Sequence, residues 1–356
     1  MENTISHLLA TLGPEIDDAD EESFLIFSEP IPSANLGMID PRAPSVEISI
    51  HDQDYTVHQS PAVLSSARAG GTTGAVLWKI TPLFADWISA YQSNPLWTHS
   101  LLSSSSTVVE LGCGISGLMA LTLAPFVRHY LATDQEYVRR LLRQNLETNA
   151  SMSASRTTSS KSKGKKKQPA RTEKWTSKSK TKATTSPSSS AAAAAAAPPN
   201  ITFTTLDWET DLATTLKDSV AIEDEEEPEE EEDKGFDLLI SCDCIYNEAL
   251  VAPFVRTCAD ICRLRPVYRA PGDDNNNNNN NNGTGNGNGD SSQTTRPPTI
   301  CLIAQQQRSP DVFETWLRET MRFFRVWRVS DEVAGEKLRV GSGYLVHLLL
   351  LREDVA

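Results

Sequence analysis

The chain has 356 residues, which is enough for one large α/β domain or two small ones, and it carries a formal net charge of −14 with 39% hydrophobic residues. This acidic balance argues against a protein that binds nucleic acid by neutralising its phosphates, and it favours a cationic macromolecular partner. Residues 1–20 lack the basic start and apolar run of a secretory signal, and the longest apolar stretch, 344–351, is too short to span a bilayer. We therefore expect a soluble cytoplasmic protein without a membrane partner.

Three segments are poor in apolar residues: 151–200 is rich in Ser, Thr and Lys, 222–234 is mostly acidic, and 270–298 contains an asparagine run. They cannot bury enough apolar surface to offset chain entropy, so we predict disordered insertions at surface loops. The lysine-rich part of the first, 163–167, is interpreted as a solvated loop, with nuclear targeting or RNA contact as the alternative. The acidic segment falls near the expected binding edge, where it could attract a basic substrate.

The remaining core of about 200 residues alternates strand and helix signals, which predicts an α/β fold with a doubly wound, mostly parallel sheet. A small hairpin at 46–50 and 55–58 precedes it, so we divide the chain into an N-terminal extension (1–70) and a second domain (71–356). We predict, in chain order, a helix at 78–92, a strand at 107–111, a helix from 118, a strand at 130–133, a helix at 136–149, strands at 201–206 and 236–241, a helix at 247–263, a strand at 299–304, a helix at 310–323, and a last hairpin-like pair at 324–329 and 344–351.

The first core strand runs into a glycine-rich turn. Residues 108–117 read V-V-E-L-G-C-G-I-S-G, so that a strand leads into G-x-G-x-x-G and then a helix, as in dinucleotide-binding folds. Gly112 and Gly114 would let the backbone approach a ligand closely. Asp134 ends the next strand, where its carboxylate can accept the hydroxyls of a ribose. The motif alone is weak, but together with Asp134 it predicts a nucleoside site.

NAD and S-adenosylmethionine compete for this geometry, and Glu110 discriminates between them. A carboxylate at the strand end repels a pyrophosphate but suits a phosphate-free ligand with a positive aminoacyl end. The alternative is a strand-end carboxylate that is hydrogen-bonded to local backbone amides. The glutamate therefore favours S-adenosylmethionine.

Two tryptophans and one acid are further candidates for the nucleoside site. Asp207 could accept the adenine amino group, and Trp208 could stack on the ring. Trp208 could equally pack against the sheet edge. Trp78, within G-A-V-L-W-K, could cover the cofactor or belong to the core.

The strand at 236–241 is followed by C-D-C-I-Y at 242–246, in the position where doubly wound folds bind ligands. Cys242 and Cys244 have no His or further Cys at metal-ligand spacing, so we expect no metal. The six cysteines show no C-x-x-C pair, and we interpret them as reduced core or site-lining thiols.

The E-L-G-C-G run at 110–114 resembles motif I of class I methyltransferases, and D-C-I-Y at 243–246 resembles the D-x-x-Y signature of the seven-β-strand protein-lysine methyltransferases. Segment 74–80, the L-D-W strand end at 206–208 and Asn145 fit the same group. The likeness covers the chain from about residue 45 apart from the insertions. It is greatest to the fungal ribosomal lysine methyltransferase 5 branch, related to the methyltransferase-like 21 proteins.

This resemblance implies a Rossmann-like sheet of seven strands, S-adenosyl-L-methionine as cofactor, and methyl transfer to a lysine of a basic protein, with a ribosomal protein as the candidate. It implies that Asp243 and Tyr246 face the incoming lysine. Cys242 stands where alanine is common in the family. The resemblance also implies a set of residues that line the cofactor: Trp78, Gly112, Cys113, Gly114, Asp134, Trp208 and Cys242.

The expected reaction is an in-line displacement at the sulfonium methyl, which needs a neutral amine and exclusion of water but no metal. We expect Asp243 to orient the lysine nitrogen by a hydrogen bond and Tyr246 to offer an aromatic wall to the ammonium-like transition state. Water would take the proton. Two alternatives stay open: methyl transfer to a small molecule or a nucleic acid, although no N/D-P-P-Y tetrad follows the strand, and a non-catalytic scaffold that only binds the cofactor.

Overall fold

A computed structural model describes residues 2–32, 37–68, 71–160, 197–219, 233–269 and 296–353. Most of each predicted insertion (151–200, 222–234, 270–298) lies outside the described residues, so their disorder stays a prediction. The helix α7 (Arg139–Ser160) continues into the first insertion, past the predicted end at residue 149.

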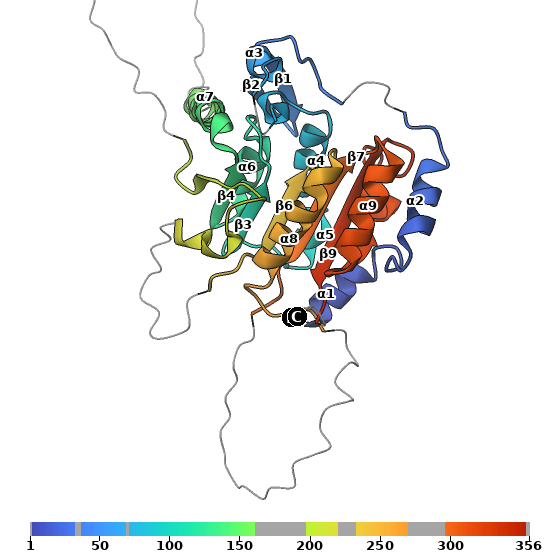
Figure 1. The fold of residues 1–356 in the computed structure, drawn as a ribbon. Coiled ribbons are helices and arrows are strands. Elements are labelled where there is room, and N and C mark those ends of the chain that lie inside the picture. The colour runs from blue at the N-terminus through green and yellow to red at the C-terminus, as the bar shows by residue number, and fades with distance from the viewer. Residues whose placement is uncertain are drawn as a thin grey trace, which may run out of the picture.

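The centre of the fold is a seven-stranded sheet with the order β5-β4-β3-β6-β7-β9-β8 (Figure 1). The five strands from β3 to β7 run parallel, and β9 pairs antiparallel with both β7 and β8. The chain moves outward from β3 and then returns to β6 on its other side, which makes the β3–β6 border the switch point of a doubly wound sheet. The predicted fold class is confirmed. The strands are β3 (Thr107–Leu111), β4 (His129–Asp134), β5 (Ile201–Thr205), β6 (Leu238–Cys242), β7 (Ile300–Gln306), β8 (Phe324–Arg328) and β9 (Tyr344–Leu351).

Helices cover both faces of the sheet and form two cores (Figure 1). Successive strand residues point to opposite faces, so Val108 belongs to one core and Val109 to the other. Because the central strands are buried on both faces, they read as nearly continuous apolar runs. The first core is covered by α1 (Glu2–Leu9), α4 (Ile80–Ile88), α6 (Leu118–Leu123) and α7, and the second by α2 (Ala19–Phe27), α8 (Val251–Cys262) and α9 (Pro310–Met321).

The predicted hairpin, β1 (Ser45–Ile50) and β2 (Gln53–His58), docks against α7 through two buried asparagines. Asn145 accepts a hydrogen bond from the His58 N–H (2.8 Å) and donates one to the His58 carbonyl (3.0 Å). Asn149 makes the same pair of bonds with Thr56, at 2.9 and 3.0 Å. The two side chains thus pair with β2 as a neighbouring strand would. The hairpin and the residues after position 70 contribute to the same hydrophobic core. The domain boundary at residue 70 stays a prediction.

Several helices differ from the prediction. Helices α1 and α2, together with the short α3 (Pro61–Leu64), α5 (Pro95–Thr98) and α10 (Asp331–Ala334), were not expected. The predicted helix at 78–92 is shorter, because the backbone before Ile80 pairs with the N-terminal segment. Trp78 forms an antiparallel bridge with Met38, and the Lys79 N–H donates to the Gly37 carbonyl at 2.7 Å. In the described part of the chain, no helix combines the length and apolar character needed to cross a membrane.

Candidate active site

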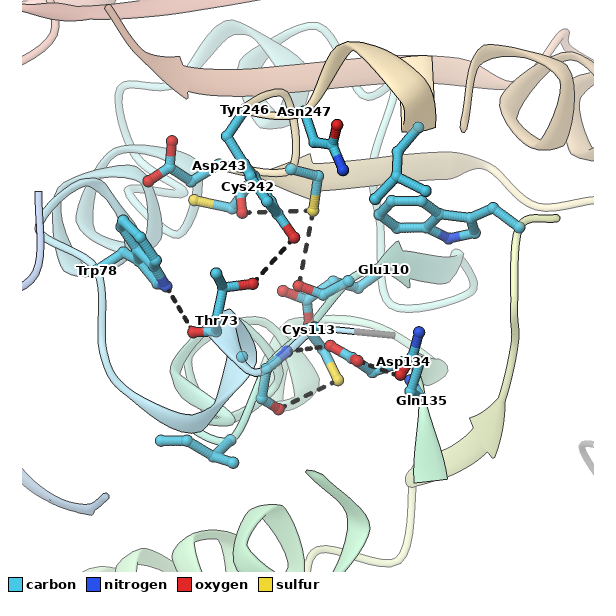
Figure 2. A pocket seen from close by; sticks show the side chains of 18 of the residues that line it. Thr73, Trp78, Glu110, Cys113, Asp134, Gln135, Cys242, Asp243, Tyr246 and Asn247 are labelled. Carbon is cyan, nitrogen blue, oxygen red and sulfur yellow. Dashed lines mark hydrogen bonds between the residues drawn. The ribbon is translucent and has the colours of Figure 1, made fainter. Parts of the chain in front are cut away.

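A cavity of about 470 Å³ opens at the carboxyl ends of β3, β4 and β6, beside the switch point (Figure 2). Its volume lies in the range of small-molecule and cofactor pockets. The structure brings all the site residues predicted from the sequence to its walls. They are Trp78, Glu110, Gly112, Cys113, Gly114, Asp134, Asp207, Trp208, Cys242, Asp243 and Tyr246. Their roles remain predictions.

The glycine turn after β3 requires its glycines. Gly112 has φ +69°, and a Cβ there would lie 2.4 Å from the sulfur of Cys244. Gly114 has φ +59°, and its N–H donates to Oδ2 of Asp134 at 2.8 Å. These left-handed conformations turn the chain sharply toward the end of β4. The turn and Asp134 therefore form one wall of the cavity.

Two acids lie close to each other on that side of the cavity. Burial raises the pKa of Glu110 to about 8, while the hydrogen bond from Tyr130 (2.8 Å) lowers it and Asp134 raises it. Burial likewise raises the pKa of Asp134 to about 6, against the lowering effect of the Gly114 and Gln135 N–H groups. The ionised Asp134, and Glu110 once it has lost its proton, are complementary to a cation and repel a pyrophosphate.

Trp208 also lines the cavity beside the glycine turn, and its ring packs edge-on against Phe254, with centroids 5.0 Å apart. One atom of this indole comes within 3.3 Å of the position of a Cβ on Gly112, so the ring closes over the turn. Asp207 accepts a hydrogen bond from the Glu209 N–H at 3.0 Å. The side of the cavity near β5 therefore offers an aromatic ring and a carboxylate, as the sequence predicted for an adenine.

The residues of the D-x-x-Y run lie across the cavity from Asp134 (Figure 2). The hydroxyls of Tyr246 and Thr73 are hydrogen-bonded at 2.9 Å, and Tyr246 remains 39% exposed. Trp78 donates its indole N–H to the Thr73 carbonyl at 3.0 Å. Burial raises the pKa values of Cys242 and Cys244, so both thiols stay neutral. This side of the cavity has two aromatic side chains joined through Thr73.

Asp243 lines the cavity, but its carboxylate is already bonded within the protein. Arg308 donates to both carboxylate oxygens, at 2.6 and 2.5 Å, and the Gln306 N–H donates to Oδ1 at 3.2 Å. The Asp243 side chain is 1% exposed, and its backbone is left-handed, with φ +63°. The predicted direct hydrogen bond to a lysine nitrogen would have to compete with Arg308. The ion pair fixes the Asp243 carboxylate at the wall of the cavity, and the role predicted for it stays a prediction.

The sequence prediction missed three residues that support the site. Thr73 links Tyr246 to Trp78, and the Tyr137 hydroxyl accepts a hydrogen bond from the Gly74 N–H at 3.0 Å. Arg308 pairs with Asp243, 65 positions earlier in the chain. Arg308 could have been predicted from its position just after a buried strand, because this places it at the same edge of the sheet as the D-x-x-Y run.

A family model described as lysine methyltransferase matches residues 59–170, fewer than half of the chain. The match includes the glycine turn, Asp134 and all of α7. It ends before the D-x-x-Y run.

Curated relatives give partial matches. A ribosomal lysine N-methyltransferase 5 from Zygosaccharomyces rouxii is 42% identical over 108 residues, covering 27% of this chain and 34% of the relative. One of the same name from Candida glabrata is 29% identical over 229 residues, covering 57% and 59%. A diaminohydroxyphosphoribosylamino-pyrimidine deaminase from Schizosaccharomyces pombe is 34% identical over 135 residues, covering 38% and 32%. The chain thus matches between about a third and three fifths of the length of these relatives. The predicted resemblance to the protein-lysine methyltransferases is confirmed.

Proposed function

We propose that this protein is an S-adenosylmethionine-dependent protein-lysine N-methyltransferase whose substrate is a basic protein of the ribosome. The observation that carries the proposal is a single cavity that joins the glycine turn, the acids Glu110 and Asp134, and the D-x-x-Y run. The lysine methyltransferase match and the relatives named for lysine methylation support it. Action on a ribosomal protein would place the reaction in the cytoplasm.

The chemistry of the cavity wall fits S-adenosylmethionine. This cofactor supplies a methyl group on a cationic sulfonium, has a positively charged ammonium end, and carries no phosphate. Glu110 and Asp134 would hold its cationic and ribose parts, and Trp208 would cover the adenine. A dinucleotide would instead bring two phosphates toward two buried acids.

The opposite side of the cavity fits a lysine. Tyr246 offers an aromatic face to the methylene chain of the lysine and to the positive charge that develops on its nitrogen. Trp78, which the resemblance assigned to the cofactor, is joined to Tyr246 through Thr73, and we propose that it contributes a second face. As the nitrogen lone pair forms the new N–C bond, the C–S bond breaks and its electron pair stays on sulfur. Before this attack the lysine ammonium loses one proton to water, and the methylated product is again an ammonium. The residues of this chain contribute orientation and exclusion of water.

The deaminase name of one relative does not transfer to this chain. Zinc-dependent nucleobase deaminases hold their metal in an H-x-E and P-C-x-x-C signature. The sequence contains neither an H-x-E nor a C-x-x-C run. The match covers 32% of that relative, so the rest of its length has no counterpart in the alignment.

Incubation of the purified full-length chain with radiolabelled S-adenosylmethionine tests the proposal. The acceptor is a lysate from a strain in which the gene is disrupted, and the labelled band is analysed by mass spectrometry. We expect label on a lysine of a ribosomal protein, and no label with an Asp134→Ala control. Label on a nucleic acid or a small molecule alone would contradict the proposal.

A further inference from the structure

Arg308 and Asp243 form a buried ion pair at the acceptor side of the cavity. The two contacts of 2.6 and 2.5 Å are bidentate, and the side chains are 18% and 1% exposed. The same guanidinium lies 5.0 Å from the centre of the Trp78 ring. Arg308 also borders a small hollow that it shares with Tyr246. The pair is thus fixed between the two aromatic walls proposed for the lysine, where solvent screens its charges little.

If the proposed function holds, this pair acts on the protonation of the substrate. Only a neutral amine has the lone pair that attacks a methyl group, whereas free lysine has a pKa of about 10.4. A lone carboxylate within about 4–6 Å would favour the ammonium form and raise this pKa by about 1–3 units. A guanidinium bonded to that carboxylate cancels the effect, because the pair carries no net charge.

The other titratable groups around this position do not replace Arg308. Burial raises the pKa values of Tyr246 and of Tyr344 on β9, which keeps both hydroxyls neutral. The Cys242 thiol is neutral for the same reason. The four other acids of the cavity wall, Glu110, Asp134, Asp207 and Glu209, lie at the cofactor side. Among the described residues that line the acceptor side, Asp243 and Arg308 are therefore the charged ones.

We propose that Arg308 is a positioning residue for methyl transfer, which neutralises Asp243 and so allows the bound lysine to lose its proton. Arg308 acts through Asp243 and through the ring of Trp78. The balance between the two charges then sets the pH at which the substrate nitrogen becomes nucleophilic.

The test is the pH profile of kcat for four proteins: wild type, Arg308→Met, Asp243→Asn and the double variant. The assay measures tritiated methyl transfer from S-adenosylmethionine to salt-extracted ribosomal proteins from a gene-disrupted strain, with methyl-lysine identified by amino-acid analysis. We expect the inflection to rise by about one pH unit or more in Arg308→Met, where a negative charge is unopposed. It should fall in Asp243→Asn and return close to the wild-type value in the double variant, which has neither charge.

If Arg308 and Asp243 had a purely structural role, the variants would have a lower kcat but an unshifted inflection of the pH profile. The double variant would then be no more active than either single variant. That pattern would overturn the inference while the proposed function stands. Arg308→Lys, which keeps the charge, should retain the wild-type inflection even where its rate is lower, and a shifted inflection there would also overturn the inference. Calorimetric affinity for S-adenosylmethionine, expected within about threefold of wild type, verifies folding because the pair lies away from the cofactor acids. Absence of lysine methylation by the wild type would overturn the proposed function and this inference with it.

Discussion

The hydroxyl of Tyr130 donates a hydrogen bond of 2.8 Å to Oε2 of Glu110, and both side chains are buried. The bond favours the ionised form of Glu110, but burial outweighs it and raises the pKa of this carboxyl to about 8. Near neutral pH most Glu110 side chains therefore carry a proton. A cation that binds beside Glu110 has to displace that proton, so ligand binding and protonation are linked.

Affinity for S-adenosylmethionine should rise with pH between about 6.5 and 7.5, below the range in which the α-amino group of the ligand loses its own proton. Binding releases one proton from Glu110, whose pKa is about 8. Below this pKa, each fall of one pH unit should therefore lower the affinity by up to about tenfold. Calorimetric titrations in buffers of different ionisation enthalpy measure both the affinity and the proton release. Asp134, with a pKa of about 6, contributes mainly below this range.

Glu110→Gln is the matched control for this linkage. It keeps the size of the side chain and a hydrogen-bond acceptor for Tyr130, but it does not titrate. We expect weaker binding with a nearly flat pH dependence between about pH 6.5 and 7.5. A wild-type affinity that does not change with pH would contradict the role of Glu110.

His347 should make the protein sensitive to acid. Its ring is buried against Trp316 and Phe313, neither ring nitrogen has a hydrogen-bond partner among the described residues, and burial lowers its pKa to about 3. In the unfolded chain this histidine binds a proton near pH 6.5. The free energy of unfolding is therefore not reduced by His347 above that pH, and it decreases as the pH falls from 6.5 toward 3. The loss is up to about 1.4 kcal/mol per pH unit. Urea unfolding at pH 7.5 and 5 should show a smaller difference in His347→Leu than in wild type, and an equal difference would refute this account.

Removal of the Trp208 ring should weaken cofactor binding. The ring lies over the glycine turn and packs edge-on against Phe254. We expect Trp208→Ala to lose roughly 1–3 kcal/mol of binding free energy for S-adenosylmethionine, the usual range for stacking of a base on an aromatic side chain. Trp208→Phe should retain most of the affinity in the same calorimetric assay. Unchanged affinity in Trp208→Ala would assign the ring to the core alone.

Asn145 should be important for stability. Its side chain bonds to the backbone of His58 and to the Ile115 carbonyl, at distances from 2.6 to 3.0 Å. Asn145→Ala leaves these groups without partners, so we expect a loss of about 2–4 kcal/mol in the free energy of unfolding. Gln144→Ala, an exposed neighbour on α7, should change it by less than about 0.5 kcal/mol. Equal effects of the two substitutions in urea unfolding would show that the hairpin does not depend on Asn145.

The sheet could be predicted from the sequence because its strands are buried on both faces. The predicted bounds of β3 and β9 coincide with the observed ones, since each is a largely apolar segment with clear limits. The helices α1 and α2 were missed because they are short. In α2, the acidic residues 20–22 are followed by the apolar run 24–27, and Phe24 and Leu25 are exposed, so its periodicity is weak. The start of α4 was placed too early because the pairing of Trp78 with Met38 is not visible in local sequence.

The candidate site, like the fold, could be predicted from the sequence only in part. Residues at the carboxyl ends of parallel strands, such as Glu110 and Asp134, could be placed together because strand order alone brings them to one edge. The environment of each carboxyl could not be predicted in this way. The ion pair of Asp243 with Arg308 joins two strand ends that no local pattern links, and it occupies the carboxylate that was predicted to bond to the lysine nitrogen.

The most direct test of the account is calorimetric titration of the wild-type protein with S-adenosylmethionine and, separately, with NAD. The cavity wall formed by Glu110 and Asp134 should accept a phosphate-free cationic nucleoside and reject a dinucleotide. We predict saturable one-to-one binding of S-adenosylmethionine and no measurable binding of NAD. Tight binding of NAD, with no heat from S-adenosylmethionine, would contradict the account.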